Sequence, residues 1–379
     1  MSDKPQSPFD PEFLESLDHE TPFFIFSKDK ITDNFSEFKR FFPNSLIQYA
    51  IKSNSEPEVL SILDEAGCGF ELASAFELHM LQKLKIAPDR ITYGTSVKSA
   101  GHIKDFFEYG VDRFACDSFS ELEKIAANAP GSKVYIRVIA NDSGSVFKFS
   151  EKFGTDITNV VSLLLRAKEL GLQPYGISFH VGSQASDVEA WGNTVEALVA
   201  VFEELQDKGI TLDVLNIGGG FPCQYASSEA VPTLEDISTS VLSACKKLPY
   251  QPKLMLEPGR GLIGNTSVVV ATVIARVERK GGTWLFLDAG CYNALFETMA
   301  YQGSTRYSVS SMRSVGGSGE SLFSLAGPTG DSQDVITREA LLPQDIEVGE
   351  KLVFHNTGAY SLVVVSEFNG FKKPAVYYI

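Results

Sequence analysis

The chain contains 379 residues, which is long enough for two domains with a large hydrophobic core. Hydrophobic residues make up 44% of it and charged residues 21%, as in an ordinary globular protein, and the net charge is −15. Nucleic acids and anionic membranes attract clustered cations, so we expect neither as a partner of this acidic chain.

The cysteines and the start of the chain favour a cytoplasmic protein. Five cysteines without CxxC spacing predict neither a disulfide framework nor a zinc site. The first five residues, MSDKP, lack a basic-then-apolar signal segment, and no apolar run is long enough to cross a bilayer. The five histidines show no paired ligand spacing, so we expect no metal site.

From about residue 45 to 260, short apolar runs alternate with amphipathic stretches. The expected strands are Ile47–Ile51, Gly69–Leu72, Ile91–Tyr93, Arg113–Ala115, Lys133–Ile139, Tyr175–Phe179, Leu212–Ile217 and Lys253–Leu256. The expected helices are Pro57–Ala66, Ala75–Leu84, Ala100–Tyr109, Ser118–Ala127, Asp156–Leu170, Val188–Lys208 and Leu234–Leu248. Eight alternations predict a (β/α)8 barrel, rather than an open sheet with one switch point.

The pattern changes after about residue 266. Alternating, β-branched runs follow over Ser267–Arg276, Trp284–Asp288, Lys351–Phe354 and Ala375–Ile379, and they predict an all-β domain. We therefore expect a barrel over residues 23–265 and a β domain over residues 266–379. An N-terminal segment, residues 1–22, is expected to be disordered or packed on the β domain.

Reactive and polar residues stand at the ends of the expected barrel strands. Lys52 closes the first of these strands, and a primary amine there can hold an aldehyde cofactor as a Schiff base. Most strand-end lysines are merely solvated, so the neighbouring strand ends decide between the two interpretations. Barrel enzymes place their sites at the carboxyl ends of the strands, where Glu71, Arg137, His180 and Glu257 are also expected.

Two glycine-containing loops predict a phosphorylated ligand. Gly218, Gly219 and Gly220 follow the seventh strand and offer bare backbone amides, while Gly259 and Arg260 follow the eighth. Either loop alone could be a tight turn. Glu257 ends an apolar strand, and a buried carboxylate needs a cation or a proton, which a protonated pyridine nitrogen would supply.

Together these residues resemble the barrel-type (fold type III) pyridoxal-phosphate decarboxylases of ornithine, lysine, arginine and diaminopimelate, most closely the ornithine/lysine branch. The resemblance covers nearly the whole chain. It is carried by Tyr49–Asn54, Phe70–Ser74, Ser150–Gly154, Ser178–Ser183, Asn216–Pro222, Leu256–Gly261, Gly327–Thr329, Thr357–Tyr360 and Phe368–Gly370.

The resemblance implies a role for each matching residue. Lys52 would carry pyridoxal phosphate, His180 would stack on its ring, and Glu257 would pair with the pyridine nitrogen. The implied phosphate contacts are Ser183, Gly218, Gly219, Gly220, Gly259, Arg260 and Tyr360. The implied supporting residues are Glu71, Glu77 and Arg137. The family also implies a homodimer with shared active sites, with Lys152 and Asp334 forming a salt bridge across the interface.

The chain departs from the family at the substrate end. Gly330 stands where the family has a proton-donating cysteine, and Ala300 stands where relatives carry an aspartate for the distal ammonium of the substrate. Asp331 remains as a substrate contact, together with Phe368. Cys291 could supply a replacement thiol or could simply pack.

We therefore expect an α-decarboxylase of an ornithine-like, lysine-like or modified L-amino acid. Glu257 favours decarboxylation over racemisation, because a carboxylate at the pyridine nitrogen keeps the ring a strong electron sink. Two alternatives stay open. One is decarboxylation-dependent transamination, and the other is a non-catalytic regulatory homologue.

Overall fold

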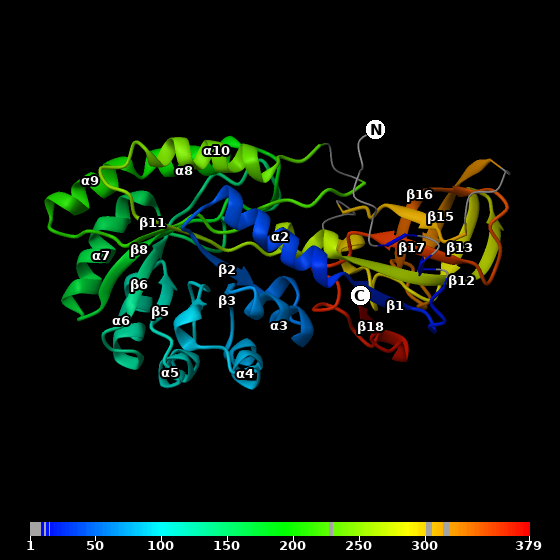
Figure 1. The fold of residues 1–379 in the computed structure, drawn as a ribbon, viewed down its shortest axis with the longest axis horizontal. Coiled ribbons are helices and arrows are strands. Elements are labelled where there is room, and N and C mark those ends of the chain that lie inside the picture. Colours follow the sequence, from blue (N-terminus) through cyan, green and yellow to red (C-terminus); the bar gives the residue numbers. More distant parts are fainter. Residues whose placement is uncertain (1–8, 11–12, 15, 227–229, 301–304, 314–318) are drawn as a thin grey trace. The chain divides into compact units, whose positions relative to one another are not determined.

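The computed structural model describes residues 9–10, 13–14, 16–226, 230–300, 305–313 and 319–379. By its internal contacts the chain divides into two units. The barrel unit comprises residues 32–222 and 231–262, and the β unit comprises residues 1–31, 223–230 and 263–379 (Figure 1). Residues 1–8, 11–12 and 15 of the predicted N-terminal segment lie outside the described residues.

Eight parallel strands close the barrel in the order β10-β11-β2-β3-β4-β5-β6-β8. The strands are β2 (Leu46–Ala50), β3 (Gly69–Leu72), β4 (Ile91–Tyr93), β5 (Arg113–Cys116), β6 (Lys133–Arg137), β8 (Gln173–Ser178), β10 (Val214–Asn216) and β11 (Lys253–Leu256). They coincide with the eight apolar runs of the sequence. The predicted (β/α)8 barrel is therefore confirmed.

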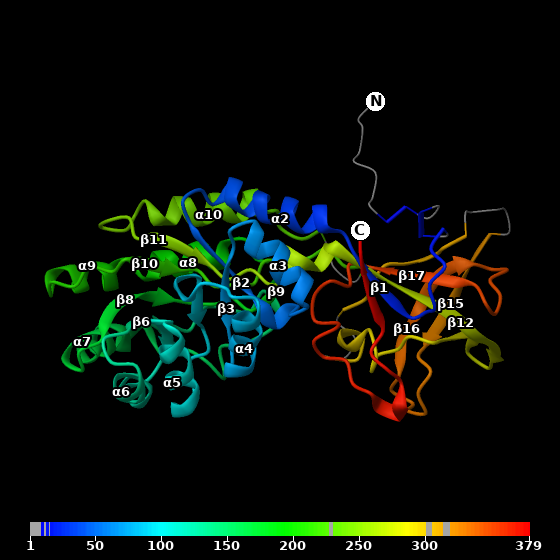
Figure 2. The ribbon, with the colours of Figure 1, turned by 60° about the horizontal axis from the view of Figure 1, so that its bottom comes forward.

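Helices cover the outside of the barrel (Figures 1 and 2). They are α2 (Lys28–Phe41), α3 (Pro57–Glu65), α4 (Ala75–Lys83), α5 (Ala100–Tyr109), α6 (Phe119–Asn128), α7 (Val160–Glu169), α8 (Glu189–Ala197), α9 (Val199–Asp207) and α10 (Leu234–Cys245), and the short helix α11 (Arg260–Ile263) follows β11. Serine side chains cap α4, α5 and α6 by accepting from a backbone N–H of the first turn, and a capping box begins α10. Helix α2 was not predicted, and the predicted helix Val188–Lys208 is divided at Leu198 into α8 and α9.

The β unit contains one eight-stranded sheet with the path β14-β17-β12-β13-β15-β16, to which β1 adds by pairing with β12, and β18 by pairing with β1. Its strands are β1 (Phe23–Phe26), β12 (Ser267–Arg279), β13 (Gly282–Leu287), β14 (Val309–Ser311), β15 (Glu320–Ala326), β16 (Val335–Pro343), β17 (Lys351–His355) and β18 (Ala375–Tyr378). The predicted all-β domain is confirmed as a fold.

Strand β1 corrects the predicted start of the barrel. Phe23 pairs antiparallel with Val270 of β12 and parallel with Ala375 of β18, so β1 belongs to the sheet of the β unit. Its partners lie more than 240 residues further along the chain. A local apolar pattern such as FFIF cannot reveal pairing at that distance.

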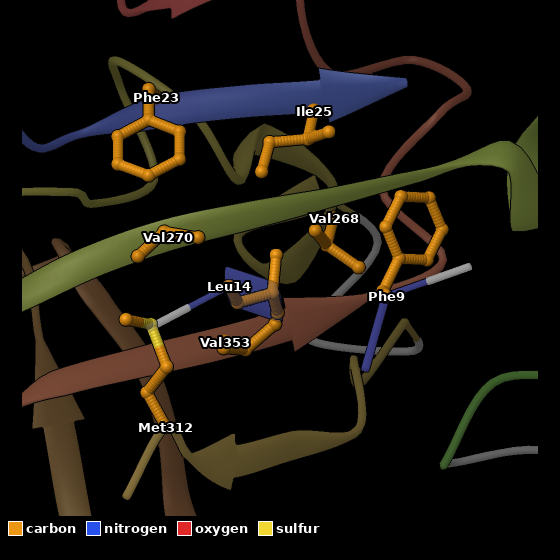
Figure 3. Close-up of a cluster of buried hydrophobic side chains, with 8 residues drawn as sticks. All are labelled: Phe9, Leu14, Phe23, Ile25, Val268, Val270, Met312 and Val353. Carbon is orange, nitrogen blue, oxygen red and sulfur yellow. The ribbon is translucent and has the colours of Figure 1, made fainter. Parts of the chain in front are cut away.

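The described part of the N-terminal segment packs on the β unit. Phe9 and Leu14 join a buried cluster with residues of β1, β12, β17 and the loop after β14 (Figure 3). The other members are Phe23, Ile25, Val268, Val270, Met312 and Val353. Among the described residues, no helix is long and apolar enough to cross a bilayer.

Candidate active site

Lys52 lies in a short 3-10 turn, Ile51–Ser53, that directly follows β2. Ser53 Oγ donates to Ala50 O at 2.9 Å, and Tyr49 Oη donates to Asn54 O at 2.9 Å, so both ends of the turn are held. The Lys52 side chain is 42% exposed. The fixed backbone therefore presents a flexible amine at the carboxyl end of the barrel, where a ligand can reach it.

Glu71 and Glu77 supply negative charge beside this amine. Oε2 of Glu71, at the end of β3, lies 3.6 Å from Lys52 Nζ, and the Glu71 side chain is only 3% exposed. Oε2 of Glu77 accepts from Ala73 N at 2.5 Å. Burial, and then the charge of Glu71, raise the pKa of Glu77 to about 7.

Glu257 follows β11 and is held by Asn216 at the end of β10. Asn216 Nδ2 donates to Glu257 Oε1 at 2.6 Å, while Asn216 Oδ1 accepts from Gly218 N at 2.9 Å. Burial, and next the nearby charge of Glu71, raise the pKa of Glu257 to about 7. Asn216 therefore ties this carboxylate to the first glycine of the loop that follows β10. The sequence places Asn216 in the motif Asn216–Pro222 but does not predict this double contact.

His180 is held as a neutral ring. Its Nδ1 accepts from Gly182 N at 3.0 Å, and the Phe149 ring meets it edge-on at a centroid distance of 4.9 Å. Burial, with the positive charges of Arg137 and Lys52, lowers the pKa of His180 well below its usual value. A neutral imidazole can stack on a cationic ring without electrostatic repulsion.

The loop after β10 requires glycine for close approach. Gly218 and Gly220 have φ of +67° and +99°. A Cβ on Gly219 would lie 2.7 Å from Glu257 O, and one on Gly220 would lie 2.7 Å from Gly182 O. Only a backbone without side chains fits here, and its amide groups are the kind of donor that binds phosphate.

Arg260 places a buried cation beside this loop system. The residue is 4% exposed, its Nε donates to Ser183 Oγ at 3.3 Å, and its guanidinium lies 5.1 Å from the Phe147 ring centroid. Before it, Gly259 packs so closely on the Lys52 turn that a Cβ would lie 3.1 Å from Ser53. The loop after β11 therefore brings the Arg260 cation and the Lys52 turn into one small volume.

Arg137, on β6, adds a second cation to the barrel mouth. Burial lowers its pKa, and the charges of Glu257 and Glu71 oppose that shift. The mouth therefore combines two guanidinium cations, the Lys52 amine, three acids and a neutral histidine. This set can hold a ligand that carries both a phosphate and a protonated ring.

The β unit holds the expected substrate residues in a second cluster. Tyr292 Oη donates to Asp331 Oδ2 at 2.5 Å, and Gln333 N donates to Asp331 Oδ1 at 2.9 Å. Gly330 N donates to Asn369 Oδ1 at 2.9 Å, and Phe368 meets the Tyr292 ring at 4.7 Å. Asp331, Gly330 and Phe368 thus belong to one surface, to which Tyr292 and Asn369 must be added.

Cys291 is fully buried among the described residues of the single chain. It is 0% exposed, its Sγ lies 3.2 Å from Thr298 Oγ1, and burial is the main reason why its pKa rises to about 12. We therefore interpret it as a packing residue rather than as a replacement proton donor. Ala300 is partly exposed near the short turn Phe296–Thr298, and Tyr360 has a φ of +52°.

Asp334 organises the loop that contains Gly330. Its carboxylate, only 2% exposed, accepts from Cys291 N at 2.7 Å, Thr329 N at 3.1 Å and Thr329 Oγ1 at 2.7 Å. Lys152 is exposed and lies 5.0 Å from the Phe153 ring centroid. The salt bridge between Lys152 and the Asp334 of a second copy stays a prediction.

Comparison with known proteins follows the same division of the chain. The sequence model of the family described as pyridoxal-dependent decarboxylase, pyridoxal binding domain, matches residues 28–264. A lysine/ornithine decarboxylase of Selenomonas ruminantium is 31% identical over 93% of this chain and 88% of its own length. The solved structure of SrLDC with PLP and cadaverine has a TM-score of 0.89 at 30% identity, covering 100% of this chain and 95% of the other.

Relatives that are named inhibitors also match this chain. Antizyme inhibitor 2 of Xenopus laevis is 29% identical to this chain, over 94% of it and 80% of the relative. Overall likeness therefore does not separate proteins named decarboxylase from proteins named inhibitor, and the residues of the site must decide.

Proposed function

Because this chain belongs to the pyridoxal-dependent decarboxylase family, we propose that it removes the α-carboxylate of an L-amino acid as carbon dioxide and leaves an amine. One observation carries the proposal. A lysine amine, a carboxylate with raised pKa and a glycine loop that excludes side chains meet at one barrel mouth. An inhibitor that acts only by binding needs none of these three groups.

The residues at the barrel mouth fit pyridoxal phosphate. Its phosphate matches the amides of Gly218–Gly220, the Ser183 hydroxyl and the buried Arg260 cation. Its protonated pyridine nitrogen matches Glu257, whose charge is otherwise penalised by burial. Its aldehyde matches the Lys52 amine, which extends from the backbone turn that Ser53 holds in place.

When bound, pyridoxal phosphate supplies an aldehyde that takes up the amine of the substrate and a ring that accepts the electron pair left by carbon dioxide. Lys52 would hold the cofactor covalently through its side-chain amine. Glu257 keeps the ring nitrogen protonated, because a cation beside it favours its charged form and brings its pKa down from about 7. His180 covers the ring face as a neutral group.

We propose a homodimer in which the barrel of one copy works with the β unit of the other. The reason is that Asp331, Gly330 and Phe368 form a recognition surface without a reactive group of its own. Lys152 and Asp334 would lie at that interface, and Tyr360 would complete the phosphate contacts. A cytoplasmic location is supported by the five cysteines, which are buried and form no disulfide.

The substrate is proposed to be ornithine-like or lysine-like, or a modified derivative that is bulkier or less cationic at its far end. Asp331 offers one carboxylate, and its hydrogen bond from Tyr292 already lowers its pKa. Ala300 and Gly330 offer space in place of a carboxylate and a thiol. Without an acid at position 330, protonation at the cofactor carbon would give decarboxylation-dependent transamination as the second outcome.

The test combines cofactor mapping with a substrate panel. Borohydride reduction and peptide mass mapping should place the pyridoxyl adduct on Lys52, whereas an adduct on another lysine would contradict the site. The protein is then incubated with basic amino acids and their derivatives, and carbon dioxide, amine and aldehyde are measured separately. A Lys52 adduct without turnover of any panel member would favour the non-catalytic alternative.

A further inference from the structure

One loop of the barrel unit contacts three groups of the candidate cofactor site. Residues 140–154 leave the barrel after β6 and return to the same point. There Thr155 N donates to Arg137 O at 2.9 Å, and Ile139 N donates to Thr155 O at 3.0 Å. The two ends therefore lie close together, as in a compact Ω-loop. We call residues 140–154 the aromatic strap, because three phenylalanines stand within them.

Two of these phenylalanine rings lie against residues that the cofactor would contact. The Phe147 ring centroid lies 5.1 Å from the guanidinium of Arg260, at the start of α11. The Phe149 ring meets the ring of His180, after β8, at a centroid distance of 4.9 Å and an interplanar angle of 78°. One short segment therefore contacts the loops that follow two different barrel strands.

The third ring, Phe153, lies at the anchored end of the strap. Its centroid is 5.1 Å from the guanidinium of Arg137 on β6. The next residue, Gly154, has a φ of +97°, and its N–H donates to Asp117 Oδ2 at 2.9 Å. The end of the strap is thus fixed both to β6 and to the loop that follows β5.

Asp142 closes the strap on itself. Its carboxylate accepts from Phe149 N at 2.8 Å, from Ser150 N at 2.9 Å and from Ser150 Oγ at 2.9 Å. Asp142 is only 7% exposed. Burial opposes its ionisation, but the hydrogen bonds from Ser150 and Phe149 outweigh burial and lower its pKa. A charged acceptor therefore holds the backbone that carries Phe149.

A short antiparallel pair joins the strap to the expected phosphate contacts. Strand β7 (Ser145–Phe147) pairs with β9 (Ser183–Ala185), and Phe147 stands opposite Ser183. The Ser183 hydroxyl accepts from Arg260 Nε at 3.3 Å. Phe147 is thus connected to Arg260 twice, through its ring and through the strand pairing that positions Ser183.

Aromatic contacts of this kind fix orientation without supplying a reacting group. A ring against a guanidinium excludes water from one face of the cation, while the N–H groups in the guanidinium plane can still donate to an anion. A ring edge against an imidazole limits the tilt of the imidazole plane. Both contacts arrange the site before the ligand arrives, and a preorganised site binds more tightly.

We propose that the aromatic strap positions the site for the two ends of the cofactor separately. Phe147 orients Arg260 for the phosphate, and Phe149 orients His180 for the ring. Asp142 keeps both phenylalanines in place by closing the strap. The ligand named here rests on the proposed function, whereas the closure by Asp142 does not.

The test compares two ligands that differ by the phosphate group. Dissociation constants of pyridoxal phosphate and of pyridoxal are measured for the full-length, cofactor-free wild type, Phe147→Leu and Phe149→Leu. Leucine keeps an apolar side chain at each position but removes the ring. Phe147→Leu should raise the constant for pyridoxal phosphate about 10-fold, the scale of one desolvated contact between a cation and a ring. It should leave the constant for pyridoxal unchanged, a split that a general loss of stability would not give.

Phe149→Leu should act at the ring end instead. We expect it to raise both dissociation constants by a similar factor, about fivefold, the scale of one aromatic pair. The visible circular dichroism of bound pyridoxal phosphate should change in Phe149→Leu and stay as in wild type in Phe147→Leu. Phe149→Tyr, which keeps the ring of this half-buried residue, should bind both ligands as wild type does.

Asp142→Asn tests the closure of the strap without any ligand. The amide keeps the side-chain volume but loses the charge, so amide hydrogen exchange at Phe149 and Ser150 should become about 10-fold faster in the cofactor-free protein. Val146→Ala is the matched control, because Val146 lies on the strap but is 40% exposed. It should leave the exchange rates and both dissociation constants unchanged.

The results that would overturn the inference are specific to each residue. For Phe147 it is an equal effect on both ligands, or none on either; for Phe149 it is unchanged binding and an unchanged spectrum. For Asp142 it is unchanged amide exchange. If Phe147→Leu does not fold, Phe147→Met, which also lacks the ring, takes its place. Failure of wild type to link pyridoxal phosphate to Lys52 would instead overturn the proposed function, and the exchange rates would still decide the role of Asp142.

Discussion

The carboxylates at the barrel mouth and those in the Gly330–Asp331 loop lie in contrasting environments. At the mouth, the pKa values of Glu77 and Glu257 are raised to about 7, mainly by burial. In the loop, hydrogen bonds from Tyr292 and Gln333 lower the pKa of Asp331, and Asp334 is satisfied by three donors. Burial thus penalises the charged forms of the carboxylates at the mouth, while the carboxylates of the loop are satisfied by hydrogen bonds.

This difference between the two environments indicates which region needs a ligand. Groups that are held in unfavourable ionisation states gain most from a bound molecule of matching charge, and such groups concentrate at functional sites. Groups that are already paired can select a substrate by shape and by one remaining charge. We therefore assign cofactor chemistry to the barrel mouth and substrate selection to the loop.

The strongest way to break this assignment is to separate the two regions between subunits. Lys52→Ala and Asp331→Ala should each lose activity, for Lys52→Ala by on the order of 10⁴-fold, the scale of deleting a group that acts covalently. Mixed under conditions of proven subunit exchange, they should regain part of the activity, because each hybrid dimer contains one intact site.

The control for that mixture is Lys52→Ala with Glu257→Gln. Both lesions lie in the barrel, so no hybrid dimer contains an intact barrel and activity should stay lost. Recovery in the control, or no recovery in the first mixture, would contradict sites shared between a barrel and the β unit of the partner.

Glu257→Gln tests the charge at the mouth alone. The amide keeps the side-chain volume but removes the anion that would keep the pyridine nitrogen protonated, so kcat should fall by on the order of 10²- to 10³-fold, as when a buried charge loses its partner. The visible absorbance of the bound cofactor should shift as well. Asp331→Asn, which removes an anion from the loop, should raise KM and leave the visible absorbance of the bound cofactor unchanged. A spectral shift in Asp331→Asn would contradict the separation of cofactor chemistry from substrate selection.

Gly330→Cys tests whether the loop can regain chemistry. A Cβ at Gly330 would lie 3.7 Å from Asn369 Oδ1, so the thiol fits. We expect turnover of ornithine or lysine to rise about 10-fold and the amine-to-aldehyde ratio to increase, as part of the 10²- to 10⁴-fold that a positioned acid contributes. Gly330→Ala fills the same space without a proton and should do neither. If wild type already gives only amine from ornithine and Gly330→Cys gains nothing, the altered-substrate idea is wrong.

The smallest expected effect is on how the stability of the cofactor-free protein depends on pH. Because folding raises the pKa of Glu257 from 4.5 to about 7, the folded state holds more protons in that range, and stability should fall as pH rises through it. His180, whose pKa folding lowers, acts in the opposite direction below pH 6.5. The melting temperature of Glu257→Gln should therefore fall less between pH 5 and 7 than that of wild type. Glu65→Gln, an exposed change on α3, should follow wild type.

The barrel could be predicted because its evidence is local. Each strand is a short apolar run, and Lys52, Gly218 and Arg260 directly follow such runs, so chain order alone placed them at one end of the barrel. The pairing of β1 with the distant strands β12 and β18 is not local. The sequence therefore predicted β1 as part of the barrel, whereas it belongs to the β unit.

Side-chain pairing was the other part that sequence could not give. Asn216 is recognisable in the sequence as part of a motif, but its two hydrogen bonds depend on the register of β10 beside β11. Tyr292 lies 39 residues from Asp331, which it binds, and nothing in either segment indicates the pair.

The raised pKa of Glu257 has a consequence for the life of the protein in a cell. Any ligand that binds only the folded state stabilises it by mass action. Pyridoxal phosphate would in addition pair its protonated ring with the buried carboxylate of Glu257. Newly made chains that meet little pyridoxal phosphate would spend more time unfolded and would be degraded faster. The abundance of the protein would then follow vitamin B6 status, with no dedicated regulator.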